Sequence, residues 1–258
     1  MKKNLLIIIL FFLWINNSNS QNTPDKAHKN IVTKTIHSDI LNEDRQVFVY
    51  IPNGTSDKQY PVIYLLDGKR SKVFNELIKF SNTNPHIIVG ITNNGNRTRD
   101  MTPVKISSRP GSGGANQFLN FISTELKPFI NKNYNTSSKN ILIGASNSGL
   151  FTIYAMLTQP DAFSDYISLS PTIGYCSDFI TQKVSQLKAK ECLNNKSLYI
   201  LYGLRNEMTE VTKYVPEFTT LLKNQFPYLR IYSEGLQGKD HVPVEGFVGG
   251  LNFVYENK

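Results

Sequence analysis

The sequence has few of the residues that disulfide-stabilised, metal-binding or nucleic-acid-binding proteins rely on. Its 258 residues include two cysteines, four histidines and one tryptophan. Cys176 and Cys192 have no further cysteines or histidines at ligand spacing, so we expect no metal site. The 28 basic and 20 acidic residues give only a mild positive excess, with no arginine-rich run and no basic stripe interleaved with aromatics. We therefore expect no nucleic-acid partner.

Long apolar runs are also scarce, and the one that stands out lies at the N-terminus. The segment Leu5–Trp14 is apolar and follows Lys2 and Lys3. With small residues after it, this order predicts a secretory signal peptide over residues 1–20. A membrane span needs about twenty apolar residues, so we expect no stable membrane insertion after cleavage. Cleavage would lower the net charge from +8 to +6. The expected location is periplasmic or secreted, with an uncleaved anchor as the alternative.

The remaining chain contains no internal repeat or low-complexity linker. Residues 21–30 are polar and are predicted to form a flexible N-terminus. Residues 31–258 are predicted to form a single domain, which is long enough to bury a substantial core. In an oxidising compartment a Cys176–Cys192 disulfide is an open alternative to two free thiols.

Hydrophobic periodicity indicates an antiparallel start followed by alternating strands and helices. Residues 31–38 and 45–51 alternate in polarity around a turn, which predicts a hairpin. Apolar runs predict buried strands at 61–66, 86–91, 140–144, 197–203 and 229–232. Helical spacing occurs over 117–130, 151–157, 215–224 and 247–255. This order predicts an α/β-hydrolase-like architecture: a mostly parallel central sheet with an antiparallel N-terminal hairpin and helices on both faces.

The turn after the 140–144 strand is the strongest candidate for chemistry. In Gly144-Ala145-Ser146-Asn147-Ser148-Gly149, a serine follows an apolar strand and precedes a helical run. That order is typical of a nucleophile elbow, a sharp turn whose neighbours must be small. Ser148 replaces the second glycine of the G-x-S-x-G pattern, which weakens the match. The turn alone does not distinguish a catalytic serine from a glycine-rich turn without chemistry.

A catalytic serine needs a general base, and that base is usually oriented by an acid. In hydrolases of this architecture the chain order is nucleophile, acid, histidine. His241 follows the last predicted strand and is the candidate base. The acid should come from the loop after Gly203, where Glu207 lies nearest the strand end. Glu210, or a dyad without an acid, remains an alternative.

Two backbone N–H groups are expected to bind the oxyanion of the tetrahedral intermediate. Asn147, directly after the nucleophile, is one candidate donor. The second should lie in the loop after the 61–66 strand, where Gly68 and Lys69 are the candidates.

Candidate substrate-binding residues lie at the same edge of the predicted sheet. Arg97 and Arg99 follow the 86–91 strand and could bind an anionic or polyhydroxylated substrate. The alternative for Arg99 is an ion pair with Asp100 that braces the loop. Tyr175 is assigned to substrate binding as well.

Several segments, taken together, resemble the putative esterase family, the esterase D-like branch of the α/β-hydrolases that includes the ferric-enterobactin esterases. They are residues 60–68, 97–103, 113–118, 144–149 and 168–171. The resemblance runs from about Ile36 to Tyr255 and implies a carboxyl-ester hydrolase, with Ser146 as the nucleophile and His241 as the base.

The sequence departs from this family at three places that bear on substrate specificity. Ser148 replaces the usual glycine of the elbow. Lys69-Arg70 follow Asp67-Gly68, where related sequences often carry an acidic residue. Val242-Pro243 follow the histidine, where the family usually has a small-residue step such as Gly-Ser.

The predicted function is therefore an exported serine esterase that forms an acyl-enzyme on Ser146 and needs no cofactor or metal. The expected substrate is a small-molecule or carbohydrate ester: an acyl-carbohydrate, which we favour for the breadth of that class, or a siderophore-type ester. Two alternatives remain. One is an acyltransferase with the same triad, and the other is a non-catalytic ligand-binding module on a hydrolase fold.

Overall fold

The computed structural model describes residues 30–54, 57–68, 72–187 and 190–256. The predicted signal peptide at 1–20 and nearly all of the predicted flexible N-terminus lie outside the described residues. Within the described ranges, no helix is both long enough and apolar enough to cross a membrane.

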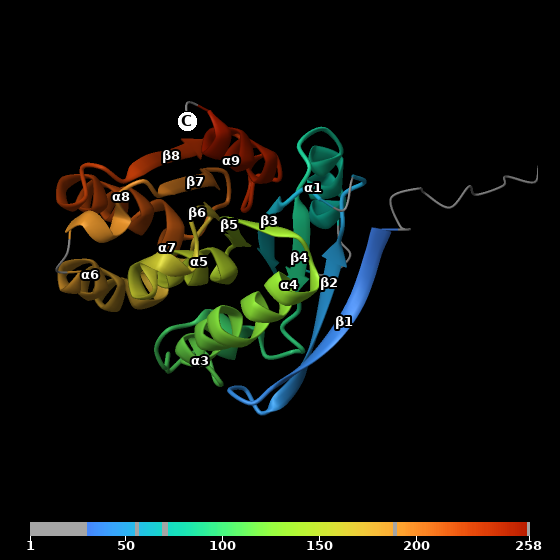
Figure 1. The fold of residues 1–258 in the computed structure, drawn as a ribbon. Helices are drawn as coiled ribbons and strands as arrows, with labels where there is room; N and C mark the ends of the chain where they lie inside the picture. The colour runs from blue at the N-terminus through green and yellow to red at the C-terminus, as the bar shows by residue number, and fades with distance from the viewer. Residues whose placement is uncertain (1–29, 55–56, 69–71, 188–189, 257–258) are drawn as a thin grey trace, which may run out of the picture.

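A mostly parallel sheet forms the centre of the described chain (Figure 1). Its order is β1-β2-β4-β3-β5-β6-β7-β8. The strands are β1 (Ile31–Ser38), β2 (Glu43–Tyr50), β3 (Tyr60–Leu66), β4 (Ile87–Ile91), β5 (Thr136–Ala145), β6 (Asp165–Leu169), β7 (Ser197–Gly203) and β8 (Arg230–Leu236). The pairs β1–β2 and β2–β4 are antiparallel, and all pairs from β4–β3 to β7–β8 are parallel. The predicted sheet and its N-terminal hairpin are confirmed.

Alternate residues of the parallel strands point into two separate cores. On β3, Ile63 and Leu65 pack with Phe74 of α1 and Phe247 of α9. Their neighbour Tyr64 packs into the larger core on the opposite face. Helices therefore cover both faces, as predicted: in Figure 1, α1 and α9 lie above the sheet, and α3, α4, α5 and α6 lie below it.

The helices that flank the sheet are α1 (Lys72–Thr83), α2 (Arg97–Met101), α3 (Ala115–Asn120), α4 (Lys127–Asn133), α5 (Asn147–Thr158), α6 (Ser177–Gln186), α7 (Thr209–Thr212), α8 (Tyr214–Gln225) and α9 (Gly246–Tyr255). The helix predicted over 117–130 is a continuous run in which the π-helical segment η2 (Phe121–Leu126) joins α3 to α4. Short 3₁₀ turns are η3 (Pro160–Ala162), η4 (Ile173–Cys176) and η5 (Lys190–Leu193).

The two cysteines are not paired with each other. Cys176 and Cys192 are both free thiols, which is one of the two alternatives left open by the sequence. Cys176 ends η4 and is buried, and this burial raises the pKa of its thiol to about 12. Cys192 lies in η5, which contacts η3 on another part of the larger core.

Candidate active site

Ser146 occupies a strained turn between β5 and α5. Its φ of 59° and ψ of −123° lie in a region that non-glycine residues rarely adopt and that recurs at functional sites. Its N–H donates to the carbonyl of Leu169 at 2.8 Å, which ties the turn to the end of β6. Gly144 must lack a side chain, because a Cβ there would lie 2.2 Å from the carbonyl oxygen of Ser148. The turn therefore has the strand–turn–helix geometry of a nucleophile elbow.

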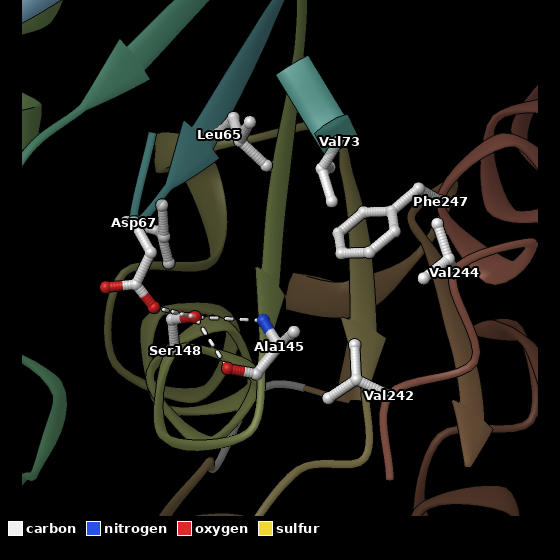
Figure 2. Close-up of a pocket in the computed structure, with 9 residues that line it drawn as sticks. Leu65, Asp67, Val73, Ala145, Ser148, Val242, Val244 and Phe247 are labelled. Carbon is white, nitrogen blue, oxygen red and sulfur yellow. Dashed lines mark hydrogen bonds between the residues drawn. The ribbon is translucent and has the colours of Figure 1, made fainter. Parts of the chain in front are cut away.

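Ser148, where the family pattern has glycine, fastens this turn to the end of β3. Its hydroxyl accepts the N–H of Ala145 at 2.9 Å and lies 3.0 Å from Oδ2 of Asp67 (Figure 2). The carbonyl of Ala145, at 2.7 Å, is a second acceptor for the hydroxyl proton. The departure from glycine thus adds polar contacts that connect the turn to Asp67.

Glu207 and His241 form a close hydrogen-bonded pair at the ends of β7 and β8. Oε1 of Glu207 lies 2.5 Å from Nδ1 of His241, and the Glu207 side chain has no exposed surface. The carboxylate also accepts the N–H of Met208 at 2.9 Å and the hydroxyl of Ser170 at 2.7 Å. These donors fix the orientation of the carboxylate. Glu210, the alternative acid, lies further along the chain in α7.

Ser170 connects this pair to the turn that carries Ser146. Ser170 directly follows Leu169, whose carbonyl accepts the N–H of Ser146. The hydroxyl of Ser170 accepts the N–H of Val242 at 3.0 Å. Both segments also line one pocket of about 200 Å³, to which the turn contributes Ala145 and the segment after His241 contributes Val242. Among the described residues, no hydrogen bond joins Ser146 directly to His241, and such bonds often tighten only when substrate is present.

The two predicted sources of oxyanion donors differ in the structure. Asn147 is the first residue of α5, so its N–H has no acceptor within the helix. The N–H of Gly68, however, donates to the carbonyl of Ile91 at 2.9 Å. The ladder between β3 and β4 continues past the end of β3 and uses this group, so the prediction for Gly68 is corrected. Lys69 lies outside the described residues.

Arg97 braces the turn from the side of β3. Its guanidinium binds the carboxylate of Asp67, with a closest contact of 2.8 Å, and donates to the carbonyl of Ala145 at 3.3 Å. Asp67 also accepts a bond from Asn93 at 2.8 Å. The charge of Arg97 is therefore largely balanced beside the site.

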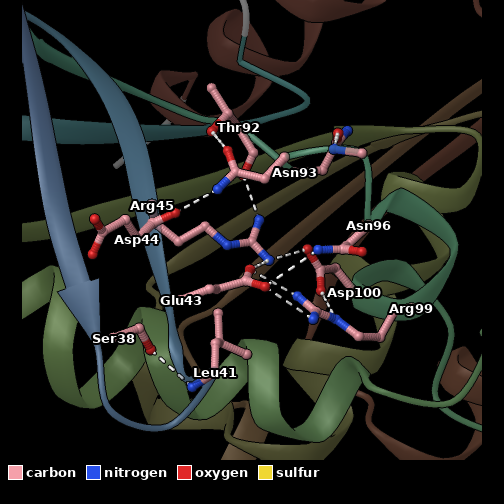
Figure 3. Close-up of polar contacts among 12 residues, drawn as sticks. Ser38, Leu41, Glu43, Asp44, Arg45, Thr92, Asn93, Asn96, Arg99 and Asp100 are labelled. Carbon is pink, nitrogen blue, oxygen red and sulfur yellow. Dashed lines mark hydrogen bonds and ion pairs between the residues drawn. The ribbon is translucent and has the colours of Figure 1, made fainter.

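Arg99 belongs to an ion cluster beside the turn of the N-terminal hairpin (Figure 3). It donates to Glu43 at 2.9 Å and to Asp100 at 2.8 Å. The fully buried Arg45 contacts the same two carboxylates, each at 2.6 Å. Hydrogen bonding from Arg99 holds the pKa of Glu43 below its ordinary value. The structure thus favours the bracing alternative for Arg99 over the predicted substrate contact.

Tyr175 contacts Arg109, which was not among the site residues predicted from the sequence. The Tyr175 hydroxyl lies 3.8 Å from the sulfur of Met208, the neighbour of Glu207. The guanidinium of Arg109 lies over the Tyr175 ring, 3.6 Å from its centroid. Within the described ranges Arg109 forms no ion pair, unlike Arg97 and Arg99. In the sequence, Arg109 is distinguished only as a basic residue within a segment rich in serine, proline and glycine.

The other described histidines lie elsewhere. His37 is exposed on β1 beside Asp44, and His86 is buried between the Asn84 carbonyl and the Tyr255 hydroxyl. The described part of the chain holds no group of three or more His, Cys, Asp or Glu residues suited to a metal ion.

The strained serine turn and the Glu207–His241 pair lie at the carboxyl edge of a mostly parallel sheet, which is the arrangement of an α/β-hydrolase. The family model described as putative esterase matches residues 38–241, and the chain belongs to that family. An IroE-like serine hydrolase from Shewanella oneidensis superimposes with a TM-score of 0.77 at 25% identity, over 88% of this chain and 80% of that one.

Two curated proteins are similar in sequence. The ferri-bacillibactin esterase BesA of Bacillus subtilis is 32% identical over 190 residues, 62% of this chain and 65% of that protein. The apo-salmochelin esterase of Escherichia coli is 28% identical over 179 residues, 61% of this chain and 56% of that protein. The matches thus span less than two thirds of either relative. Together with the family, they support a carboxylic ester hydrolase.

Proposed function

We propose that this protein is a serine carboxyl-ester hydrolase acting on siderophore-type esters, with Ser146 as nucleophile, His241 as base and Glu207 as the orienting acid. The main observation behind it is the 2.5 Å contact between Glu207 and His241 beside the strained Ser146 turn. The names of the similar curated proteins favour a siderophore-type ester over the acyl-carbohydrate expected from the sequence.

The proposed reaction follows from which nitrogen of His241 is engaged. Glu207 holds Nδ1, so Nε2 is left to accept the Ser146 proton as its oxygen attacks the ester carbonyl. The same nitrogen then protonates the leaving alcohol. Water, deprotonated by His241, hydrolyses the acyl-enzyme and restores Ser146. Glu207 remains a carboxylate throughout and stabilises the imidazolium.

The oxyanion of each tetrahedral intermediate would be held at the N-terminus of α5. The N–H of Asn147 is a donor there, and the helix dipole favours negative charge at this position. Lys69 remains the proposed second donor.

Substrate selection would use Arg109 and Tyr175. Arg97 is paired with Asp67 and Arg99 with two carboxylates, whereas Arg109 forms no ion pair within the described residues. Its guanidinium lies on the side of the site where Tyr175 contacts Met208. An anionic or aromatic part of the ester would bind there through charge and stacking.

Export is part of the proposal and depends on residues 1–20. Cleavage after Ser20 would release a periplasmic or secreted enzyme, and residues 31–258 would act as one domain. The intact mass of the protein recovered from the periplasm or medium tests this: a mass that retains residues 1–20 would contradict cleavage.

The catalytic proposal is tested by hydrolysis of p-nitrophenyl acetate and of a catecholate trilactone. Wild-type protein should cleave both, and Ser146→Ala and His241→Ala should each lower kcat by about 10⁴- to 10⁶-fold. Transfer of the acyl group to an added sugar in preference to water would identify an acyltransferase instead. Binding without turnover, equal in wild type and Ser146→Ala, would identify a binding module.

A further inference from the structure

The pocket beside the Ser146 turn is walled by apolar side chains from elements far apart in the sequence (Figure 2). Val73 comes from the start of α1, Val242 and Val244 from the segment after His241, and Phe247 from the start of α9. The pocket volume is about 200 Å³, enough for a short group and too small for a whole siderophore.

The polar groups of this pocket are already engaged with one another. The Ser148 hydroxyl binds Ala145 and Asp67, and the Asp67 carboxylate binds Arg97. The described lining residues include no cationic side chain. An anionic group placed among these described residues would face the Asp67 carboxylate, and none of them would supply a cationic partner for it. The pocket therefore suits an uncharged apolar group.

Val242 reaches into this pocket from a strained backbone. Its φ of 60° lies in the left-handed region, where a β-branched residue is a genuine outlier. The conformation is held by a bond from its N–H to the hydroxyl of Ser170 at 3.0 Å. Glycine would adopt this backbone without strain. A valine here instead supplies a side chain to the pocket.

We propose that Val242 sets the size of a subsite for a short, uncharged, apolar group of the ester substrate. The inference rests on the proposed function, because the subsite lies between the Ser146 turn and the residue that follows His241. It assigns the anionic part of a substrate to the Arg109 side and an alkyl-like part to this pocket.

The test compares Val242→Gly and Val242→Ala with wild type on two ester series. One series keeps p-nitrophenol and lengthens the acyl group from acetyl to butyryl and hexanoyl. The other keeps the acetyl group and lengthens an alkyl alcohol. The quantity compared is the ratio of kcat/KM for the longest ester to kcat/KM for the shortest. In the series whose variable part enters the pocket, this ratio should be about tenfold higher in Val242→Gly than in wild type, with a smaller increase in Val242→Ala. Val32→Gly, at an exposed valine of β1, is the control and should keep the wild-type ratio.

The outcomes separate this inference from the proposed function. If wild type is active and Ser146→Ala is not, but the ratio is unchanged in both series, the subsite is wrong while the function stands. If wild type hydrolyses none of the esters, calorimetry on Ser146→Ala and Ser146→Ala/Val242→Gly still measures how Kd depends on chain length. If Kd depends on chain length in the same way in these two variants, the proposed subsite is wrong. Val242→Gly should also melt no lower than Val242→Ala, since glycine relieves the backbone strain.

Discussion

Oε1 of Glu207 lies 2.5 Å from Nδ1 of His241, although 34 positions separate the two residues in the sequence. The register of two parallel strands brings them together, because Gly203 at the end of β7 pairs with Leu236 at the end of β8. Each residue follows its strand within a few positions. A rigid pair of strands, rather than a single loop, therefore fixes the distance between the proposed acid and base.

Glu207→Gln should lower kcat on p-nitrophenyl acetate by about 10²- to 10⁴-fold. The amide would no longer stabilise the imidazolium that forms on His241. Glu210→Gln is the matched control and should keep kcat close to wild type, because Glu210 has no contact with His241 among the described hydrogen bonds. Equal losses in both variants, or no loss in Glu207→Gln, would remove Glu207 from the mechanism.

Arg109→Ala should raise KM for an anionic ester about tenfold while changing KM for a neutral ester much less. The loss of a charged contact carries an effect of this size. Steady-state kinetics on a matched pair, one ester with a free carboxylate and the other with its amide, measure the difference. Arg99→Ala serves as the control, since its guanidinium is held by Glu43 and Asp100. An equal rise for both esters in Arg109→Ala would indicate a general loss of structure instead.

Arg45→Met should destabilise the fold by about 3–5 kcal/mol, because it leaves the fully buried Asp100 carboxylate short of a partner. Urea unfolding at neutral pH measures this change. The double variant Arg45→Met/Asp100→Leu should recover much of the loss, since it removes the unpaired charge as well. A double variant even less stable than Arg45→Met would show that the side-chain packing, not the buried charge, carries the effect.

Stability should fall as the pH drops through about 6.5, partly because of His86. Burial holds the pKa of His86 below its ordinary value, with Lys139 adding repulsion. Just below the ordinary value the unfolded chain binds a proton that the folded His86 does not, so the free energy of unfolding decreases. Urea unfolding between about pH 7.5 and about pH 5.5 should show a smaller decrease in His86→Phe than in wild type.

His37 provides a control of opposite sign. The hydrogen bond to Asp44 raises the pKa of His37, so its stabilising contribution is present at low pH and is lost as the pH rises. His37→Asn should therefore make the decrease toward low pH steeper. A decrease that is unchanged in His86→Phe would exclude His86 as a source of the pH dependence.

The sheet was largely predictable because β3, β4 and β7 are continuous apolar runs and because β1 and β2 alternate in polarity. β6 was missed although all of Asp165–Leu169 is buried. The strand begins at Asp165, which pairs with Lys139, and its apolar run is interrupted by Ser168, which donates to the Gly149 carbonyl. The helices α1 and α6 were also missed, since each buries only a few residues on a mostly polar sequence.

The proposed nucleophile and base could be selected from the sequence because a local turn pattern and the chain order point to them. Details that depend on partners distant in the sequence could not be selected. The Gly68 N–H donates to the carbonyl of Ile91 because β3 and β4 lie in register. Arg99 pairs with Glu43, which is 56 positions away in the sequence. The unpaired state of the two cysteines and the stacking of Arg109 on Tyr175 likewise follow from packing between elements.

Covalent labelling shows whether Ser146 is an activated nucleophile, as the proposed mechanism requires. The protein would be incubated with an alkyl fluorophosphonate, digested and analysed by mass spectrometry, with Ser146→Ala and His241→Ala treated in parallel. We expect one label on the peptide that contains Ser146, no label in Ser146→Ala and strongly slowed labelling in His241→Ala. A label on another serine, or labelling at the same rate without His241, would contradict the proposed mechanism.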